Sequence, residues 1–162
     1  MLVTFIVVIS VLIAFSAIYL LVRIMSDKKS KEVLGRFQPG EVLLSSPNAN
    51  FFGKTSLGMT QVRGNGVLVL TAKELFFEMW IPKREYHIPI FSIKNIKTPK
   101  VHLGKTRFKP LLKIVFCNQH GHTDAMAWQV KHLSSWIEAL EQLRNNPNND
   151  EVKRTENDDG QK

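Results

Sequence analysis

The sequence predicts a mainly β domain preceded by one membrane-spanning helix: a bent, seven-stranded antiparallel barrel closed by a C-terminal amphipathic helix. An uncharged apolar run fills residues 2–22. From residue 41 to residue 128, short runs rich in β-branched and aromatic residues alternate with Gly, Pro and Asn turn signals. After residue 132 the apolar period changes to that of a helix. These three observations define the expected architecture.

The first element, residues 2–22, contains no charged residue, no Pro and no Gly. A helix over this segment is about 31 Å long at 1.5 Å per residue, which matches the hydrocarbon core of a bilayer. A cleaved signal peptide is the alternative, but no basic residue precedes the run and no small-residue cleavage site follows it. The segment is therefore expected to be a retained transmembrane helix.

Residues 23–38 form a basic linker in this interpretation. Arg23, Lys28, Lys29, Lys31 and Arg36 follow the apolar run closely, whereas only the α-amino group precedes it. The positive-inside rule then predicts a single-pass protein of the cell membrane, with its N-terminus outside and its domain in the cytoplasm.

Residues 39–144 are expected to form the domain, which is large enough for one hydrophobic core. A loop of about 20 residues, rich in Gly, Asn and Ser, separates its first two strands. The predicted strands are Glu41–Ser45, Val67–Thr71, Leu75–Trp80, Arg84–Pro89, Ser92–Thr98, Leu111–Cys117 and His122–Trp128.

The closing helix carries apolar residues at helical spacing, namely Leu133, Trp136, Ile137, Leu140 and Leu143. Ser135 and Glu138 have the spacing of a capping box, and Asn145-Asn146-Pro147 ends the pattern. Residues 145–162 contain one aliphatic residue and no aromatic residue, which predicts a disordered polar tail.

Charge is distributed unevenly along the chain. Residues 23–144 hold 19 Lys and Arg against 9 Asp and Glu, a balance of +10, and residues 145–162 hold 3 against 5, a balance of −2. A basic domain favours an anionic neighbour. Because the domain is expected to be tethered to a bilayer, anionic lipid headgroups are the expected neighbour, and nucleic acid is not expected.

Two stretches, GNGVLVLTAKELFFEMW at 64–80 and REYHIPIFSIKNI at 84–96, resemble the GRAM and pleckstrin-homology-like domain family. The stretch LLKIVFCNQHGHTDAMAWQV at 111–130 and the helix with Trp136 look like that family's last hairpin and closing helix. NFFG, RGNG and HLGK, at 50–53, 63–66 and 102–105, are similar to stretches of bacterial membrane-anchored proteins. The resemblance covers residues 38–144 and implies a pleckstrin-homology-like fold and no known activity.

The main candidate site is the loop 97–110, which contains five cations and no acidic residue. Gly104 permits a tight turn there, so an anion or lipid headgroup could be held by side chains and backbone N–H groups. A solvated basic loop is the alternative interpretation. The candidates for lipid or anion binding are Lys97, Lys100, Lys105, Arg107 and Lys109, with Lys54, Arg63, Lys83 and Arg84 as possible additions to the same rim.

Phe51 and Phe52, adjacent aromatics in the long loop, are candidates for insertion into a membrane interface or a partner groove. The alternative is that one of the two rings packs beneath its own loop. His120, His122 and Asp124 lack further nearby ligands, so surface residues of a hairpin are expected there rather than a metal site. Cys117 is expected to be a small sheet residue. No motif predicts a catalytic site, a metal or a cofactor.

The sequence thus favours a membrane-tethered, non-enzymatic binding or adaptor module with a basic face toward anionic lipid. A protein partner is expected, but the sequence does not identify it. The alternative is a structural subunit of a membrane complex that contacts partners through the transmembrane helix and the 47–66 loop. An enzyme is the least favoured reading.

Overall fold

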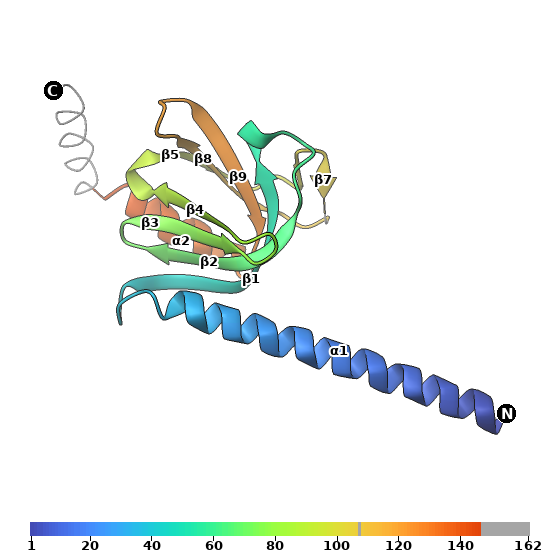
Figure 1. The fold of residues 1–162 in the computed structure, drawn as a ribbon. Helices are drawn as coiled ribbons and strands as arrows, with labels where there is room; N and C mark the ends of the chain where they lie inside the picture. The colour runs from blue at the N-terminus through green and yellow to red at the C-terminus, as the bar shows by residue number, and fades with distance from the viewer. Residues whose placement is uncertain (107, 147–162) are drawn as a thin grey trace.

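A single long helix, α1 (Leu2–Leu34), precedes a β-rich domain in the computed structural model, which describes residues 1–106 and 108–146. Within this described part, one helix is long and apolar enough to cross a bilayer. Figure 1 shows α1 projecting away from the domain, with its C-terminal end beneath the sheet. Residues 23–34 of the expected basic linker continue this helix.

Seven antiparallel strands form one curved sheet in the order β4-β3-β2-β1-β9-β8-β5. All seven predicted strands are present, and most bounds agree within two residues. The strands are β1 (Val42–Lys54), β2 (Gly64–Thr71), β3 (Glu74–Met79), β4 (Arg84–Pro89), β5 (Ile93–Lys97), β8 (Leu112–Cys117) and β9 (Thr123–Gln129).

β1 is much longer than the predicted strand and joins the two halves of the sheet. It pairs with β2 from Val42 to Phe51, and its last residues, from Asn50 to Lys54, pair with β9. Register shifts interrupt both ladders, and irregularities of this kind bend a strand. The 3-10 turn η1 (Thr55–Leu57) follows, so much of the expected long loop is strand.

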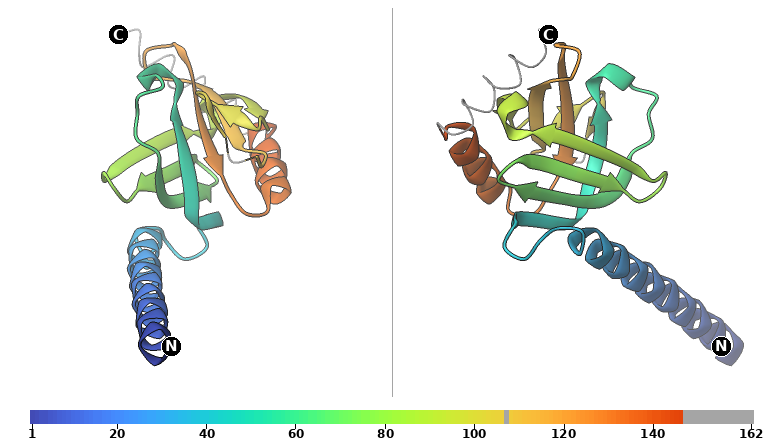
Figure 2. Two further views of the ribbon diagram at one scale, coloured as in Figure 1. Left: turned by 90° about the vertical axis from the view of Figure 1, so that its right-hand side faces the viewer. Right: turned by 60° about the vertical axis from the view of Figure 1, so that its left-hand side comes forward.

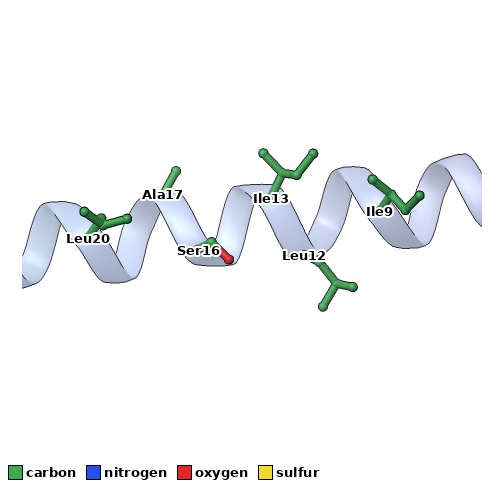
Figure 3. Close-up of a pocket in the computed structure, with 6 residues that line it drawn as sticks. All are labelled: Ile9, Leu12, Ile13, Ser16, Ala17 and Leu20. Carbon is green, nitrogen blue, oxygen red and sulfur yellow. The ribbon is translucent and has the colours of Figure 1, made fainter.

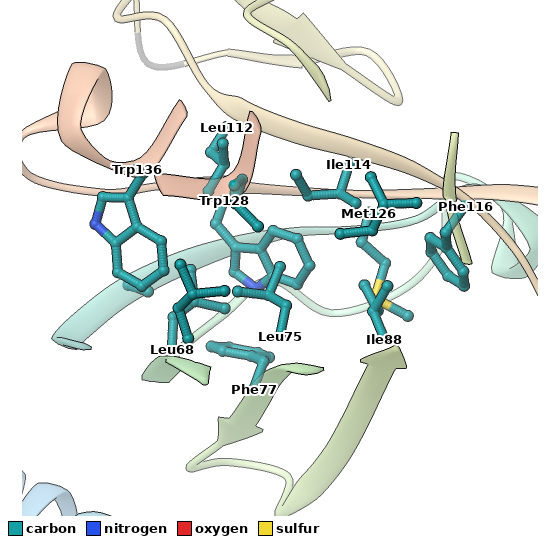
Figure 4. Packing of buried hydrophobic residues seen from close by; sticks show 14 of the residues in the cluster. Leu68, Leu75, Phe77, Ile88, Leu112, Ile114, Phe116, Met126, Trp128 and Trp136 are labelled. Carbon is teal, nitrogen blue, oxygen red and sulfur yellow. The ribbon is translucent and has the colours of Figure 1, made fainter. Parts of the chain in front are cut away.

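The core lies on the concave face of the sheet. Leu75, Phe77 and Met79 point inward from β3, and Trp128 lies at the centre, 5.7 Å from both Phe51 and Phe77 by ring centroids. Figure 4 shows Leu75, Phe77 and Trp128 converging from both halves of the sheet. Burial of this aromatic and aliphatic surface provides the main driving force for folding.

The sheet does not close into the predicted barrel. β4 and β5 are its two edges, and the 3-10 turn η2 (Ile90–Ser92) carries the chain between them. The C-terminal helix α2 (Leu133–Arg144) packs against η2, β5 and β8, and places Trp136 and Leu140 in the core. α2 therefore covers part of the open side, as the amphipathic pattern predicts.

Two local predictions need correction. The loop after β5 contains a short hairpin, β6 (Val101–His102) with β7 (Lys105–Thr106). The capping box at Ser135 is absent because α2 already begins at Leu133, after His132 in the left-handed region at φ +52°. The expected disordered tail falls mostly on residues 147–162, which lie outside the described part.

Candidate functional site

Two serines of α1 join the helix to the first strand of the sheet. Ser26 Oγ donates to Asn48 Oδ1 at 3.0 Å, and Ser30 Oγ lies 3.3 Å from the carbonyl oxygen of Pro47 and 2.8 Å from that of Ser26. Both serines are buried, although the sequence around them is strongly charged. One helical turn separates them, so they mark the face of α1 that contacts the domain.

Val33 extends this contact onto the convex face of the sheet. It is 1% exposed and packs with Val67, Val69 and Phe76, which alternate with the core residues along β2 and β3. Phe37 continues the contact beyond the helix, with its ring 5.6 Å from that of Phe76. A polypeptide segment with this burial is a fixed part of the domain rather than a free tether.

Arg36 completes the junction through charge. Its Nη1 lies 2.8 Å from Glu78 Oε2 on β3 and 3.0 Å from Glu85 Oε1 on β4. Burial raises the pKa of Glu78, whereas hydrogen bonding from Arg36 lowers the pKa of Glu85. The seam between α1 and the sheet thus consists of buried hydroxyls, an apolar contact and an ion-pair cluster.

The predicted basic loop is partly ordered by its hairpin. Lys97, Lys100 and Lys109 are exposed, and Lys105 Nζ donates to the carbonyl oxygen of Gln61 at 2.8 Å. Lys105 therefore links this hairpin to the loop between β1 and β2. Arg107 lies outside the described residues.

The other predicted cations divide into two groups. Lys83 and Arg84 are exposed at the β3–β4 turn, and Lys83 Nζ lies 3.9 Å from Glu78. Lys54 instead pairs with Asp124 at 3.4 Å, and the Arg63 guanidinium lies 4.0 Å above the Phe52 ring. Lys54 and Arg63 therefore have structural contacts that the sequence did not indicate.

Phe51 and Phe52 do not form the exposed aromatic pair that was considered for insertion. They are 1% and 0% exposed because both lie in β1, where alternate residues point to opposite faces of the sheet. Phe51 enters the main core, and Phe52 packs with Leu111 and Ala127. Both rings are buried in the domain, whereas the alternative expectation had one ring packing beneath its own loop.

Asp124 is buried, so its prediction as a surface residue of a hairpin was wrong. Its carboxylate accepts hydrogen bonds from Ser56 N at 3.0 Å, Ser56 Oγ at 2.6 Å and Ala125 N at 2.8 Å. Burial alone would raise its pKa, but these hydrogen bonds and Lys54 outweigh burial and lower it. Asp124 fastens η1 to β9, and its role is structural.

His102 is a second buried polar residue, 3% exposed on β6. Its Nε2 lies 3.1 Å from the carbonyl oxygen of Gly53, so Nε2 carries the proton and donates. Burial lowers the pKa of His102, and the nearby Lys113 and Lys105 lower it further. His120 and His122, by contrast, are exposed, and the described residues contain no group of three His, Cys, Asp or Glu placed to hold a metal ion.

A groove of about 1180 Å³ lies on the open side of the sheet. The edge strand β4 contributes Tyr86 and His87 to its wall, η2 contributes Phe91, and the turn between β8 and β9 contributes Gln119 and His120. Cys117 also lines it and is half-buried. This groove was not predicted, because it forms between strands that are distant in the sequence.

A smaller hollow of about 410 Å³ lies on the apolar part of α1. Figure 3 shows that Ser16 and Ala17 have short side chains between the larger Ile13 and Leu20. The hollow is a surface depression on a single helix, with mainly apolar walls.

No protein-family model and no curated protein sequence matches the chain. Solved structures do resemble it. The C-terminal domain of an unknown protein from Leishmania infantum matches with a TM-score of 0.50 at 17% identity, over 74% of this chain and 94% of that one. A chain of the 8S snRNP assembly intermediate matches with a TM-score of 0.51 at 8% identity, over 66% and 84%. At these identities the likeness concerns the fold alone.

Proposed function

We propose that this chain is a membrane-tethered, non-enzymatic binding module. In this proposal α1 crosses the cell membrane with its N-terminus outside, and the β domain lies in the cytoplasm. One observation carries the proposal: the apolar helix continues without a break into the packed seam with the sheet. A helix docked in this way would hold the domain at the bilayer surface in a set orientation.

The charge of the domain supports a cytoplasmic position beside anionic lipid. The exposed loops that carry Lys83, Lys100 and Lys109 contain no acidic residue between Trp80 and Arg84 or between Lys97 and Pro110. Each cation near an anionic leaflet contributes about 1 kcal/mol of attraction. The basic face is therefore expected to reinforce the orientation that α1 imposes.

The groove beside β4 is the proposed site for a protein partner. An edge strand presents backbone N–H and C=O groups that can pair with an extended segment of another chain. Tyr86 and Phe91 give the groove aromatic surface, which is common in protein-binding sites. The resemblance to GRAM and pleckstrin-homology-like domains also favours binding over catalysis.

Site-directed photo-crosslinking in native membranes tests this proposal. A photoreactive residue at Gln119, which is exposed and lines the groove, is expected to give a discrete protein adduct. The matched control is Glu138, which is exposed on α2. Equal adducts at both positions, or no adduct at Gln119, would argue against the groove as the partner-binding site. Release of the chain by alkaline carbonate would argue against anchoring.

A further inference from the structure

Exposed apolar side chains gather on three neighbouring segments of the domain. The described part of the domain exposes several large apolar residues, and all of them except Leu43 lie on these three segments. The others are Leu57, Met59 and Val62 in the loop before β2, Ile81 in the β3–β4 turn, and Val101 and Phe108 beside the short hairpin. Phe108 is 87% exposed and Ile81 is 77% exposed, so neither is explained by packing within the domain.

Two hydrogen bonds and one close approach join these three segments into one surface. Lys105 of the hairpin donates to Gln61 at 2.8 Å, and a Cβ atom at Gly104 would lie 3.6 Å from Met59 Sδ. Trp80 N donates to the carbonyl oxygen of Asn65 at 3.0 Å, which ties the β3–β4 turn to the start of β2. The segments are thus held side by side.

The direction of α1 indicates what this surface meets. In Figure 1 and in the right-hand view of Figure 2, the β6–β7 hairpin and the β3–β4 turn lie on the side of the domain toward which the apolar half of α1 extends. Helix α2 lies on the opposite side in both views. Since residues 26–34 are packed on the sheet, the domain cannot turn this surface away without breaking the seam.

We propose that this surface is a second contact with the bilayer, specific for anionic phospholipid. Met59, Val62, Ile81 and Phe108 enter the interface between headgroups and acyl chains. Lys83, Arg84, Lys100 and Lys109 pair with the phosphates around them. Apolar tips ringed by cations are the arrangement by which peripheral elements bind anionic membranes. This inference rests on the proposed anchoring by α1.

Spin labels on the full-length protein in liposomes test the surface and the anchor separately. A label at Thr60, in the Cys117→Ser background, leaves every proposed contact residue in place. In phosphatidylglycerol-containing bilayers it is expected to collide more with oxygen than with a water-soluble nickel complex. A label at the exposed Gln142 of α2 is expected to show the reverse, and a label at Leu12 reports the depth of the anchor.

The Met59→Asp/Phe108→Asp double variant is expected to move the Thr60 label into water while the Leu12 label stays in the bilayer. A water-exposed Thr60 label in the unsubstituted protein, with Leu12 still buried in lipid, would overturn the second contact and leave the anchor intact. A water-exposed Leu12 label would overturn the anchor itself.

Discussion

The hydroxyl of Ser26 donates a 3.0 Å hydrogen bond to the side-chain oxygen of Asn48, which joins two residues 22 positions apart. One partner lies on the helix that begins as an apolar segment, and the other on the first strand of the sheet. This bond and its neighbours make the helix and the domain a single mechanical unit. The first prediction addresses that unit directly.

Val33→Asp is expected to release the end of α1 from the sheet. The new carboxylate would be buried among Val67, Val69 and Phe76 without a partner, at a cost of about 3 kcal/mol or more. Hydrogen exchange of the amides of residues 26–34 in liposomes measures the release as lost protection. Lys31→Asp places the same side chain at an exposed position of the same helix and should leave protection unchanged. Equal loss in both variants would contradict the buried seam.

Truncation of a buried phenylalanine and of an exposed phenylalanine should have very different effects on the stability of the domain. Phe51→Ala removes a ring that contacts Phe77, Tyr86 and Trp128, and is expected to lower the free energy of unfolding by about 3–5 kcal/mol. Phe108→Ala removes an exposed ring and should change it by less than about 0.5 kcal/mol. Urea unfolding of the detergent-solubilised chain provides both values. Similar losses would refute the assignment of Phe51 to the core.

The lowered pKa of Asp124 predicts that the free energy of unfolding falls in acid. Its pKa is lowered in the folded chain, so its contribution is complete above the ordinary value of 3.8 and disappears as pH falls through the folded value. Asp124→Asn is therefore expected to cost about 1–3 kcal/mol at pH 7 and less as the pH drops below 4. Unfolding curves at several pH values measure the difference. Asp27→Asn, at an exposed position, should show no such convergence.

The lowered pKa of His102 predicts a second pH dependence of the free energy of unfolding, at a pH nearer to neutrality. Because its pKa is lowered by burial and by nearby lysines, the unfolded chain binds a proton that the folded chain resists. Its effect on stability is therefore absent above about pH 6.5 and destabilising as pH falls below that value. Replacing it in His102→Gln is expected to flatten this part of the profile, whereas His120→Gln should not. A profile that is the same in the wild type and His102→Gln would contradict the prediction.

The sequence predicted the elements whose signal is local. β2, β3, β4, β8, β9 and α2 have strong periodicity and clear turn residues, such as Asn118 and Gly121 between β8 and β9. Trp136 reaches the core from α2 as its helical spacing indicated.

The errors share a physical cause, which is stabilisation by distant partners. Ser46 to Asn50 reads as loop by composition, yet pairing with β2 and β9 and the burial of Phe51 make it strand. The residues after Arg23 are mostly charged or polar, so the packing of Val33 on an apolar surface of β2 and β3 was not predicted. The basic residues of the hairpin were found by charge alone. The exposed Ile81 and Phe108 beside them became visible only once the three segments were placed together.

Because α1 is continuous, the rotation of its apolar part about the helix axis is fixed relative to the domain. A helix turns by about 100° per residue, so a single residue inserted near Met25 would rotate the apolar part of α1 by that angle relative to the domain, while the seam at Ser26 stayed in place. Seven inserted residues would nearly restore the angle and lengthen the stalk by about 10 Å. A protein that binds the apolar part of α1 and the domain at the same time would respond differently to the two insertions.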